Sequence, residues 1–174
     1  MPDVLRPGVL DGVTACVAGC AGERLAELGA TVVALEADLA DEDATIAAAA
    51  ALPRPGVLVV DTAAAFGDGG MAGLRAAVDG AWNAVRAVVN AHFLEGGGKV
   101  VLVAPSTGEH ATAAGAALEN TARTVSVEWA RLDIRTTAIR PAPGTTAEEV
   151  AELAAFLASP AGDYYSGCAF SMTS

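Results

Sequence analysis

Side chains that carry acid–base or metal chemistry are scarce in this sequence. Its 174 residues include two histidines, two tyrosines and three cysteines, and the only lysine is Lys99. The cysteines, Cys16, Cys20 and Cys168, are too few and too scattered for a disulfide framework, and no second ligand pair accompanies them as in a zinc site. Neither histidine stands at ligand spacing from a cysteine or a carboxylate cluster. We therefore expect no disulfide scaffold and no metal centre.

Positive charge is scarce as well. Ten Lys and Arg residues face 21 Asp and Glu residues, which gives a formal net charge of -11. A strongly acidic chain is repelled by nucleic-acid phosphates and by anionic lipid surfaces. The composition therefore argues against nucleic-acid and membrane partners.

Long apolar runs are missing, although 53% of the residues are hydrophobic. Gly, Asp and Arg interrupt every run well before the roughly 20 residues that a membrane span needs. The opening stretch, residues 1–12, lacks the cationic segment and apolar core of a secretory signal. We therefore expect no membrane span and a cytoplasmic location.

What the sequence does contain is a regular alternation of short apolar runs with helical stretches. The expected strands are 13–19, 31–38, 56–63, 99–106, 134–144 and 164–172. The expected helices are 22–29, 42–52, 71–93, 111–132 and 146–159, the last capped by Thr146. Continuous apolar strands between helices are typical of a parallel sheet that is covered on both faces. We therefore predict one doubly wound, three-layer α/β domain over residues 1–174.

Three segments resemble a known family. "GGGKVVLVAPSTG", "GAALENTARTVSVEWARLDIRTTAIRPAPG" and "AEEVAELAAFLASPAGDYYSGCAFSM" follow one another over residues 97–174. In order and spacing they are similar to the C-terminal half of the short-chain dehydrogenase/reductase family. The first half of the chain is similar more loosely, through "LDGVTACVAG", "ERLAELGATVVAL" and "MAGLRAAVDGAWNAVRAVVNAHF". The resemblance implies a Rossmann-like fold and a connection to NAD(P)-dependent oxidoreductases.

Shortened segments coincide with the ligand loops of that family. After the first strand the family carries Thr-Gly-x-x-x-Gly-x-Gly, whose glycines let the backbone approach the cofactor pyrophosphate. Here "AGCAG" at 18–22 leads directly to Glu23 and Arg24. Segment 32–50 is interpreted as lacking one βα unit beside the adenosine site, and the substrate lid after residue 144 is missing. The resemblance therefore implies that this chain binds no NAD(P) itself.

The catalytic residues of the family are replaced. Its chemistry uses a tyrosine as general acid/base and a lysine four residues later, which lowers the tyrosine pKa. No Tyr-x-x-x-Lys exists here, because both tyrosines lie near the C-terminus and the single lysine is Lys99. By the resemblance, Ala111 takes the tyrosine position, Gly115 the lysine position and Ala77 the position of a helix asparagine. Only Ser106 matches, loosely, the catalytic serine, so we predict no catalytic residues.

Two other groups of residues have the composition of a functional site. Ser106, Glu109 and His110 have the residue types of a hydrolase triad, but they lack a G-x-S-x-G elbow, and His110 is interpreted as a polar loop residue. The acidic segment 36–43 lacks the spacing of a calcium loop and is typical of a solvated turn and helix start. Two further functions stay open. One is a stand-alone oxidoreductase with an atypical site, and the other is a small-ligand-binding regulatory module.

The surfaces that the family uses for assembly are retained. Its two long helices pack against their counterparts across a twofold axis, and here the segments 71–93 and 112–132 are both full length. We therefore expect a non-catalytic subunit that joins an active homologue, which brings the NAD(P), in a hetero-oligomeric dehydrogenase or ketoreductase. Aromatic and arginine side chains are favoured anchors of interfaces. The residues expected at the partner interface are Trp82, Arg86, Leu118, Arg123, Trp129, Tyr164 and Tyr165.

Overall fold

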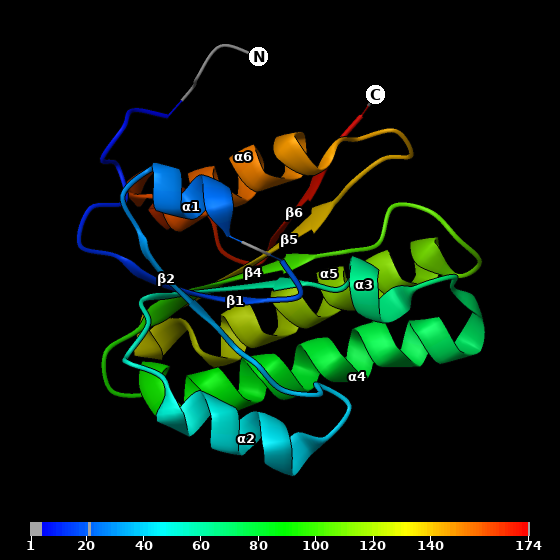
Figure 1. Ribbon diagram of the computed structural model, residues 1–174, viewed down its shortest axis with the longest axis horizontal. Coiled ribbons are helices and arrows are strands. Elements are labelled where there is room, and N and C mark those ends of the chain that lie inside the picture. Colours follow the sequence, from blue (N-terminus) through cyan, green and yellow to red (C-terminus); the bar gives the residue numbers. More distant parts are fainter. Residues whose placement is uncertain (1–4, 21, 174) are drawn as a thin grey trace.

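A six-stranded parallel sheet lies at the centre of the described part of the computed structural model, residues 5–20 and 22–173 (Figure 1). Its strands are β1 (Thr14–Ala18), β2 (Thr31–Ala34), β3 (Val57–Asp61), β4 (Gly98–Val103), β5 (Ile134–Arg140) and β6 (Cys168–Ser171). They are arranged in the order β2-β1-β3-β4-β5-β6, and all neighbouring pairs are parallel. The order reverses between β1 and β3, which is the topological switch of a doubly wound fold.

The β2 side of the sheet is shorter than in the six-stranded order 3-2-1-4-5-6 of dinucleotide-binding folds. In that order a further strand lies outside the second one, whereas here β2 is the outer strand among the described residues. The chain goes from β2 into α2 (Glu42–Ala51), which packs along α4 (Gly70–Val88). The sheet order agrees with the predicted loss of one βα unit.

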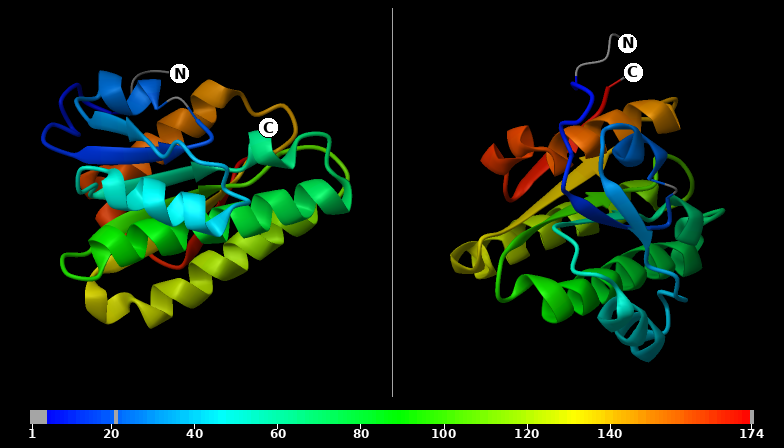
Figure 2. Two further views of the ribbon diagram at one scale, coloured as in Figure 1. Left: turned by 60° about the horizontal axis from the view of Figure 1, so that its bottom comes forward. Right: turned by 60° about the vertical axis from the view of Figure 1, so that its left-hand side comes forward.

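Helices cover both faces of the sheet (Figure 2). On one face lie α1 (Glu23–Glu27) and α6 (Ala147–Ala158), and on the other lie α2, α4 and α5 (Ala111–Glu128). Because side chains alternate along a strand, Cys16 of β1 belongs to the core under α4 and α5, while Val17 belongs to the core under α1 and α6. The predicted three-layer α/β fold is confirmed.

Helix boundaries follow local capping chemistry. The hydroxyl of Thr146 accepts from the backbone N–H of Glu149, and the Glu149 carboxylate accepts from the N–H of Thr146. This capping box begins α6 at the predicted residue. Asp41 caps α2 in the same sense, since its carboxylate accepts from the N–H of Ala44 at 3.0 Å.

The structure adds detail that the sequence pattern does not predict. A four-residue helix, α3 (Ala63–Phe66), follows β3, and the long helix expected over 71–93 continues beyond α4 as a π-helical turn, Val89–Phe93. Short 3-10 turns follow α5 and α6, at Ala130–Leu132 and Pro160–Tyr164. Within the described residues, no helix is both long and apolar enough to cross a membrane.

Candidate functional site

Two positions that replace catalytic residues lie in a buried apolar cluster. Ala77 of α4 and Ala111 and Ala114 of α5 pack together with Phe66, the last residue of α3. Their exposed fractions are 0%, 7% and 0%, and that of Phe66 is 2%. None of these side chains contains a polar atom, so the cluster holds no group that could donate or accept a proton. We call these four residues the Phe66 cluster.

A small hollow lies beside the Phe66 cluster, at the carboxyl ends of β4, β5 and β6. Its volume is about 250 Å³. Ser106, Ala111 and Gly115 all line it, so the structure brings together the retained serine position and the replaced tyrosine and lysine positions, as the resemblance implies. Among the described residues of the lining, Arg140 is the only charged one and there is no carboxylate, tyrosine or lysine. A hydroxyl without an acid/base partner cannot move the proton that hydride transfer requires.

Arg140 is held in place by an ion-pair network on α5. Its Nη1 donates to Glu119 Oε2 at 2.8 Å, and Nη2 of Arg123 lies 2.6 Å from Glu119 Oε1. Its side chain runs beside Gly115, where a Cβ atom would lie 3.3 Å from the Arg140 Nε. The Arg140 side chain therefore lies next to Gly115, which takes the family's lysine position. A guanidinium group stays protonated at neutral pH, so it cannot act as a general acid there.

The turn after β1 is tight and leads into a very short helix. A Cβ atom on Gly19 would overlap the carbonyl oxygen of Asp61, and one on Gly22 would lie 2.8 Å from a methyl carbon of Val32. Both glycines have positive φ, which only glycine adopts readily. The helix α1 that follows spans five residues and begins with the carboxylate of Glu23. Ala21, which the sequence places in the same turn, lies outside the described residues.

These features of the turn do not suit a dinucleotide pyrophosphate. Phosphate sites at helix N-termini depend on free N–H groups, a helix dipole and the absence of competing negative charge. Here the helix is short, and Glu23 occupies its first turn. Asp61, at the end of the neighbouring strand β3, adds a second carboxylate, which is close enough to Cys20 in the same turn to raise the pKa of its thiol. Glu36, which follows β2, is an acidic residue of the type that binds a ribose hydroxyl in such folds, but the βα unit beside the adenosine site is missing from the described part of the chain.

The environment of Asp61 and Cys20 is poorly solvated. Burial raises the pKa of Asp61, and an N–H···O bond from Ala63 at 2.9 Å opposes this rise. Burial and the Asp61 carboxylate raise the pKa of the Cys20 thiol to about 11, and burial raises that of Cys16 to about 12. Both thiols are therefore protonated at neutral pH and are weak nucleophiles.

The structure does not assemble the hydrolase triad that the sequence contains. His110 and Glu109 are neighbours on an exposed loop, and their closest N–O distance is 3.7 Å. In the described part of the chain, no hydrogen bond joins Ser106 to His110. His110 instead adopts a φ of 69° at the N-terminus of α5, where it allows the chain to turn into the helix. No group of three metal-ligating side chains gathers among the described residues.

The residues expected at a partner interface differ in accessibility. Trp82 and Tyr164 are exposed, at 39% and 89%, and Arg123 is exposed as well. Arg86, Trp129 and Tyr165 are half-buried: Arg86 pairs with Glu42, Trp129 packs against the core, and the Tyr165 ring contacts those of Phe156 and Phe170.

The expectation that Leu118 lies at a partner interface is wrong. Its exposed fraction is 1%, and it packs inside the core under α5. The face of α5 that carries Leu118 points toward the sheet, so this side chain is not available to a partner. The large apolar side chain of α5 that is exposed is that of Val127, at 78%.

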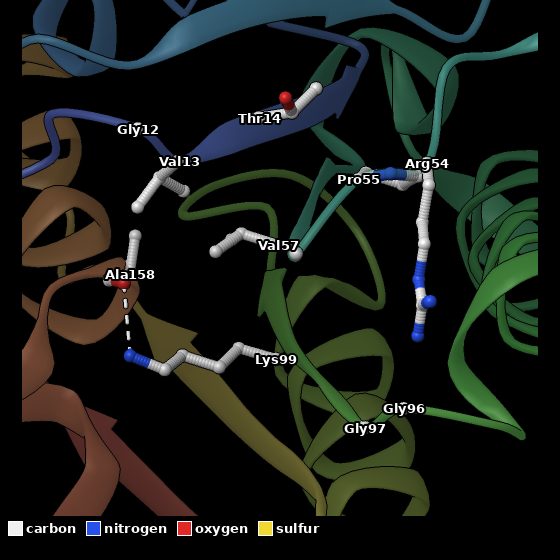
Figure 3. A pocket seen from close by; sticks show the side chains of 11 residues that line it. Gly12, Val13, Thr14, Arg54, Pro55, Val57, Gly96, Gly97, Lys99 and Ala158 are labelled. Carbon is white, nitrogen blue, oxygen red and sulfur yellow. Dashed lines mark hydrogen bonds between the residues drawn. The ribbon is translucent and has the colours of Figure 1, made fainter.

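A larger hollow of about 370 Å³ lies at the opposite edge of the sheet (Figure 3). Its lysine, Lys99, points toward the end of α6 and donates to the carbonyls of Ala158 and Ser159 at 3.0 and 2.6 Å. Nζ of Lys99 also lies 2.6 Å from Asp163 Oδ1. The single lysine of the chain therefore fastens α6 to β4 and has no free donor for catalysis.

Solved structures of other proteins share the fold of this chain. No protein-family model and no curated relative matches the sequence. A citronellol catabolism dehydrogenase from Pseudomonas aeruginosa PAO1 superposes with a TM-score of 0.78 at 23% identity, over 99% of this chain and 98% of that one. A short-chain dehydrogenase/reductase from Serratia marcescens BCRC 10948 gives 0.74 at 22%, over 94% and 96%. A 3-ketoacyl-(acyl-carrier-protein) reductase from Brucella melitensis, complexed with NADH, gives 0.76 at 21%, over 94% and 97%.

The chain has the short-chain dehydrogenase/reductase fold. This likeness, at identities below 25%, concerns the fold, and it agrees with the resemblance noted in the sequence. In a short-chain dehydrogenase/reductase fold, the hollow at the ends of β4, β5 and β6 lies where open α/β sheets bind ligands. Three residues that shape this edge were not predicted from the sequence: Phe66, Asp61 and Arg140. Of these, only Asp61 had a sequence signal, as an acidic residue that ends a buried strand.

Proposed function

We propose that this chain is a non-catalytic subunit, which assembles with an active homologue of the same fold into a hetero-oligomeric NAD(P)-dependent dehydrogenase or ketoreductase. The observation that carries the proposal is the Phe66 cluster. It packs the positions of the family's tyrosine and helix asparagine, Ala111 and Ala77, into an apolar interior. Ala111 also lines the small hollow, but its methyl group brings no acid or base to a ligand there.

In this proposal the chain binds no NAD(P), and the active partner supplies it. The short helix α1, the Glu23 carboxylate at its start and the Asp61 carboxylate near Cys20 support this view. Among the structural neighbours, the Brucella melitensis reductase is described with NADH bound, and a partner of that kind would bring the nicotinamide. The absence of nucleic-acid and membrane partners and the cytoplasmic location stay predictions.

The proposed partner surface is the outer side of α4 and α5. These helices lie side by side on one face of the molecule (Figure 2), and they contact each other directly. Trp82 on α4 and Val127 on α5 are among the large apolar side chains that remain exposed. An exposed Trp of this kind is a typical interface anchor. Through this surface the chain would stabilise the active subunit or shape its substrate entrance.

The test is co-expression with an active homologue encoded beside this chain. We expect the two to co-purify at fixed stoichiometry, and we expect Trp82→Glu and Val127→Glu to separate them. Ile46→Glu is the matched control, because Ile46 is similarly exposed but lies on α2. Titration of NADH and NADPH into the isolated chain should give no binding. A chain that never co-purifies with the homologue would refute the assembly, and micromolar nucleotide binding would favour a stand-alone enzyme.

A further inference from the structure

The hollow at the ends of β4, β5 and β6 keeps one unused set of hydrogen-bond donors. Arg140 uses Nη1 to bind Glu119, while Nε and Nη2 have no partner in the described part of the chain. These two nitrogens form one edge of the guanidinium group, which presents parallel N–H donors at the spacing of two carboxylate oxygens. The Arg140 side chain lines the hollow and is one-third exposed.

The local charge favours an anion, although the chain as a whole is acidic. Arg140 and Arg123 share the single carboxylate of Glu119, so this group of three side chains carries one net positive charge. The lining of the hollow contains no carboxylate among the described residues. Gly115 leaves the space beside Nε open, since a side chain there would press against the arginine.

The other residues that line the hollow indicate which chemical groups the rest of a ligand would have. Ser106, Thr112 and Ser171 contribute hydroxyl groups, which can donate to an oxyanion. Pro141, Pro143 and Met172 contribute apolar surface. A volume of about 250 Å³ equals the share of about eight liquid water molecules. The hollow therefore has room for a carboxylate with a short apolar body.

We propose that this hollow binds a small organic carboxylic acid. The carboxylate accepts from Nε and Nη2 of Arg140, and the apolar body packs on Pro141, Pro143 and Met172. No reaction accompanies binding, since no acid or base lies in the lining. The proposal is independent of the proposed function, because it concerns the isolated chain and holds with or without a partner subunit.

The test uses benzoate as the probe and benzamide as its uncharged isostere, titrated into the purified chain by calorimetry. We expect saturable binding of benzoate and none of benzamide. Arg140→Gln should weaken benzoate binding about ten- to hundredfold, the change that losing one or two charge-assisted hydrogen bonds produces. Arg135→Gln is the matched control. It removes the same charge from the same strand, but Arg135 bonds to Asp163 and Asp133 and does not line the hollow.

A second variant separates a lost site from a damaged fold. The negative charge of Glu119 offsets that of Arg140 and repels an anionic ligand, so Glu119→Gln should bind benzoate more tightly than the wild-type chain does. A misfolded variant would not gain affinity. Equal binding of benzoate and benzamide would overturn the proposal, as would unchanged benzoate affinity in Arg140→Gln. If inorganic phosphate bound at this arginine and benzoate did not, the assignment of a carboxylic acid would also be wrong.

Discussion

Phe66 and Ala111 share one buried apolar cluster, so an aromatic ring from α3 packs beside the position where the family's catalytic tyrosine is expected. The replacement is therefore more than the loss of a hydroxyl. An active site requires an acid/base at a surface that substrate reaches, whereas here the same position lines the hollow with a methyl group alone and packs against α3 and α4. The short helix and the alanines fit each other, and a single reverse substitution would not restore the site.

Truncation of Phe66 should destabilise the whole domain. Phe66→Ala leaves a cavity between α3, α4 and α5, and such changes in cores cost about 3–5 kcal/mol. We expect a loss of this size in the free energy of unfolding, measured with urea. Leu94→Ala is the control, because Leu94 is 43% exposed and its truncation should change stability little. Equal effects of the two substitutions would show that the Phe66 cluster does not support the fold.

Restoring the family's Tyr-x-x-x-Lys should not restore activity. In the double variant Ala111→Tyr/Gly115→Lys, the introduced tyrosine meets the Phe66 cluster, and the Cβ of the introduced lysine would press on Arg140 Nε at 3.3 Å. Overpacking of this kind costs about 1–3 kcal/mol. We expect lower thermal stability and no oxidation of NADPH by a panel of ketones. Ala113→Tyr, on the exposed side of the same helix, should be tolerated. Turnover by the double variant would contradict the proposed loss of the nucleotide site.

The single lysine should contribute to stability through the end of α6. Lys99→Met removes the donor that two carbonyls, of Ala158 and Ser159, and the carboxylate of Asp163 share. Unsatisfied groups of this kind cost about 1–3 kcal/mol. We expect that loss in urea unfolding, together with faster hydrogen exchange over residues 158–164. Arg131→Met removes an exposed charge elsewhere and should leave both measurements unchanged. Unaltered exchange in Lys99→Met would mean that α6 does not depend on this lysine.

The predictable parts of this fold were those with local signals. Apolar strands such as Val57–Asp61 were located from their composition, and Thr146 was expected as the cap that begins α6. The lost acid/base pair followed from counting, since one lysine and two C-terminal tyrosines cannot form the motif. Other features depend on contacts between distant residues. Four residues are too few to show a helical period, so α3 was missed, and Gly115 and Arg140 meet only after α5 and β5 have packed.

The sequence also does not show which face of α5 is buried against the sheet. Leu118 and Val127 are both apolar residues of α5, and the sequence does not distinguish which of them faces the sheet. In the structure Leu118 is enclosed and Val127 is exposed. The alanine-rich start of the helix weakens its amphipathic pattern, so composition alone assigned an interface role to the wrong residue. Small side chains pack equally well on the sheet of their own chain and against a partner.

The buried carboxyl group of Asp61 should make stability depend on pH in a defined direction. Burial raises its pKa above the ordinary value of 3.8. A raised pKa means that the folded state favours the protonated form, so this contribution to stability is full below pH 3.8 and is lost as the pH rises through the folded-state pKa. At neutral pH the ionised carboxylate therefore destabilises the fold. Asp61→Asn, which keeps an oxygen to accept from Ala63, should be more stable than wild type at pH 7, and this difference should disappear toward pH 3.8.

The same substitution should act on the neighbouring thiol. The Asp61 carboxylate contributes to raising the pKa of Cys20 to about 11, and burial contributes more. In Asp61→Asn we expect that pKa to fall below 11 but to stay above its ordinary value of 9.0, because burial is unchanged. The pH dependence of alkylation, measured in a Cys168→Ser background, reports on Cys20, since Cys16 is fully buried. A Cys20 titration that does not move would show that the two side chains do not interact. A separate outcome concerns stability. If Asp61→Asn were less stable than wild type at pH 7, the carboxylate would make a stabilising contact that asparagine cannot make.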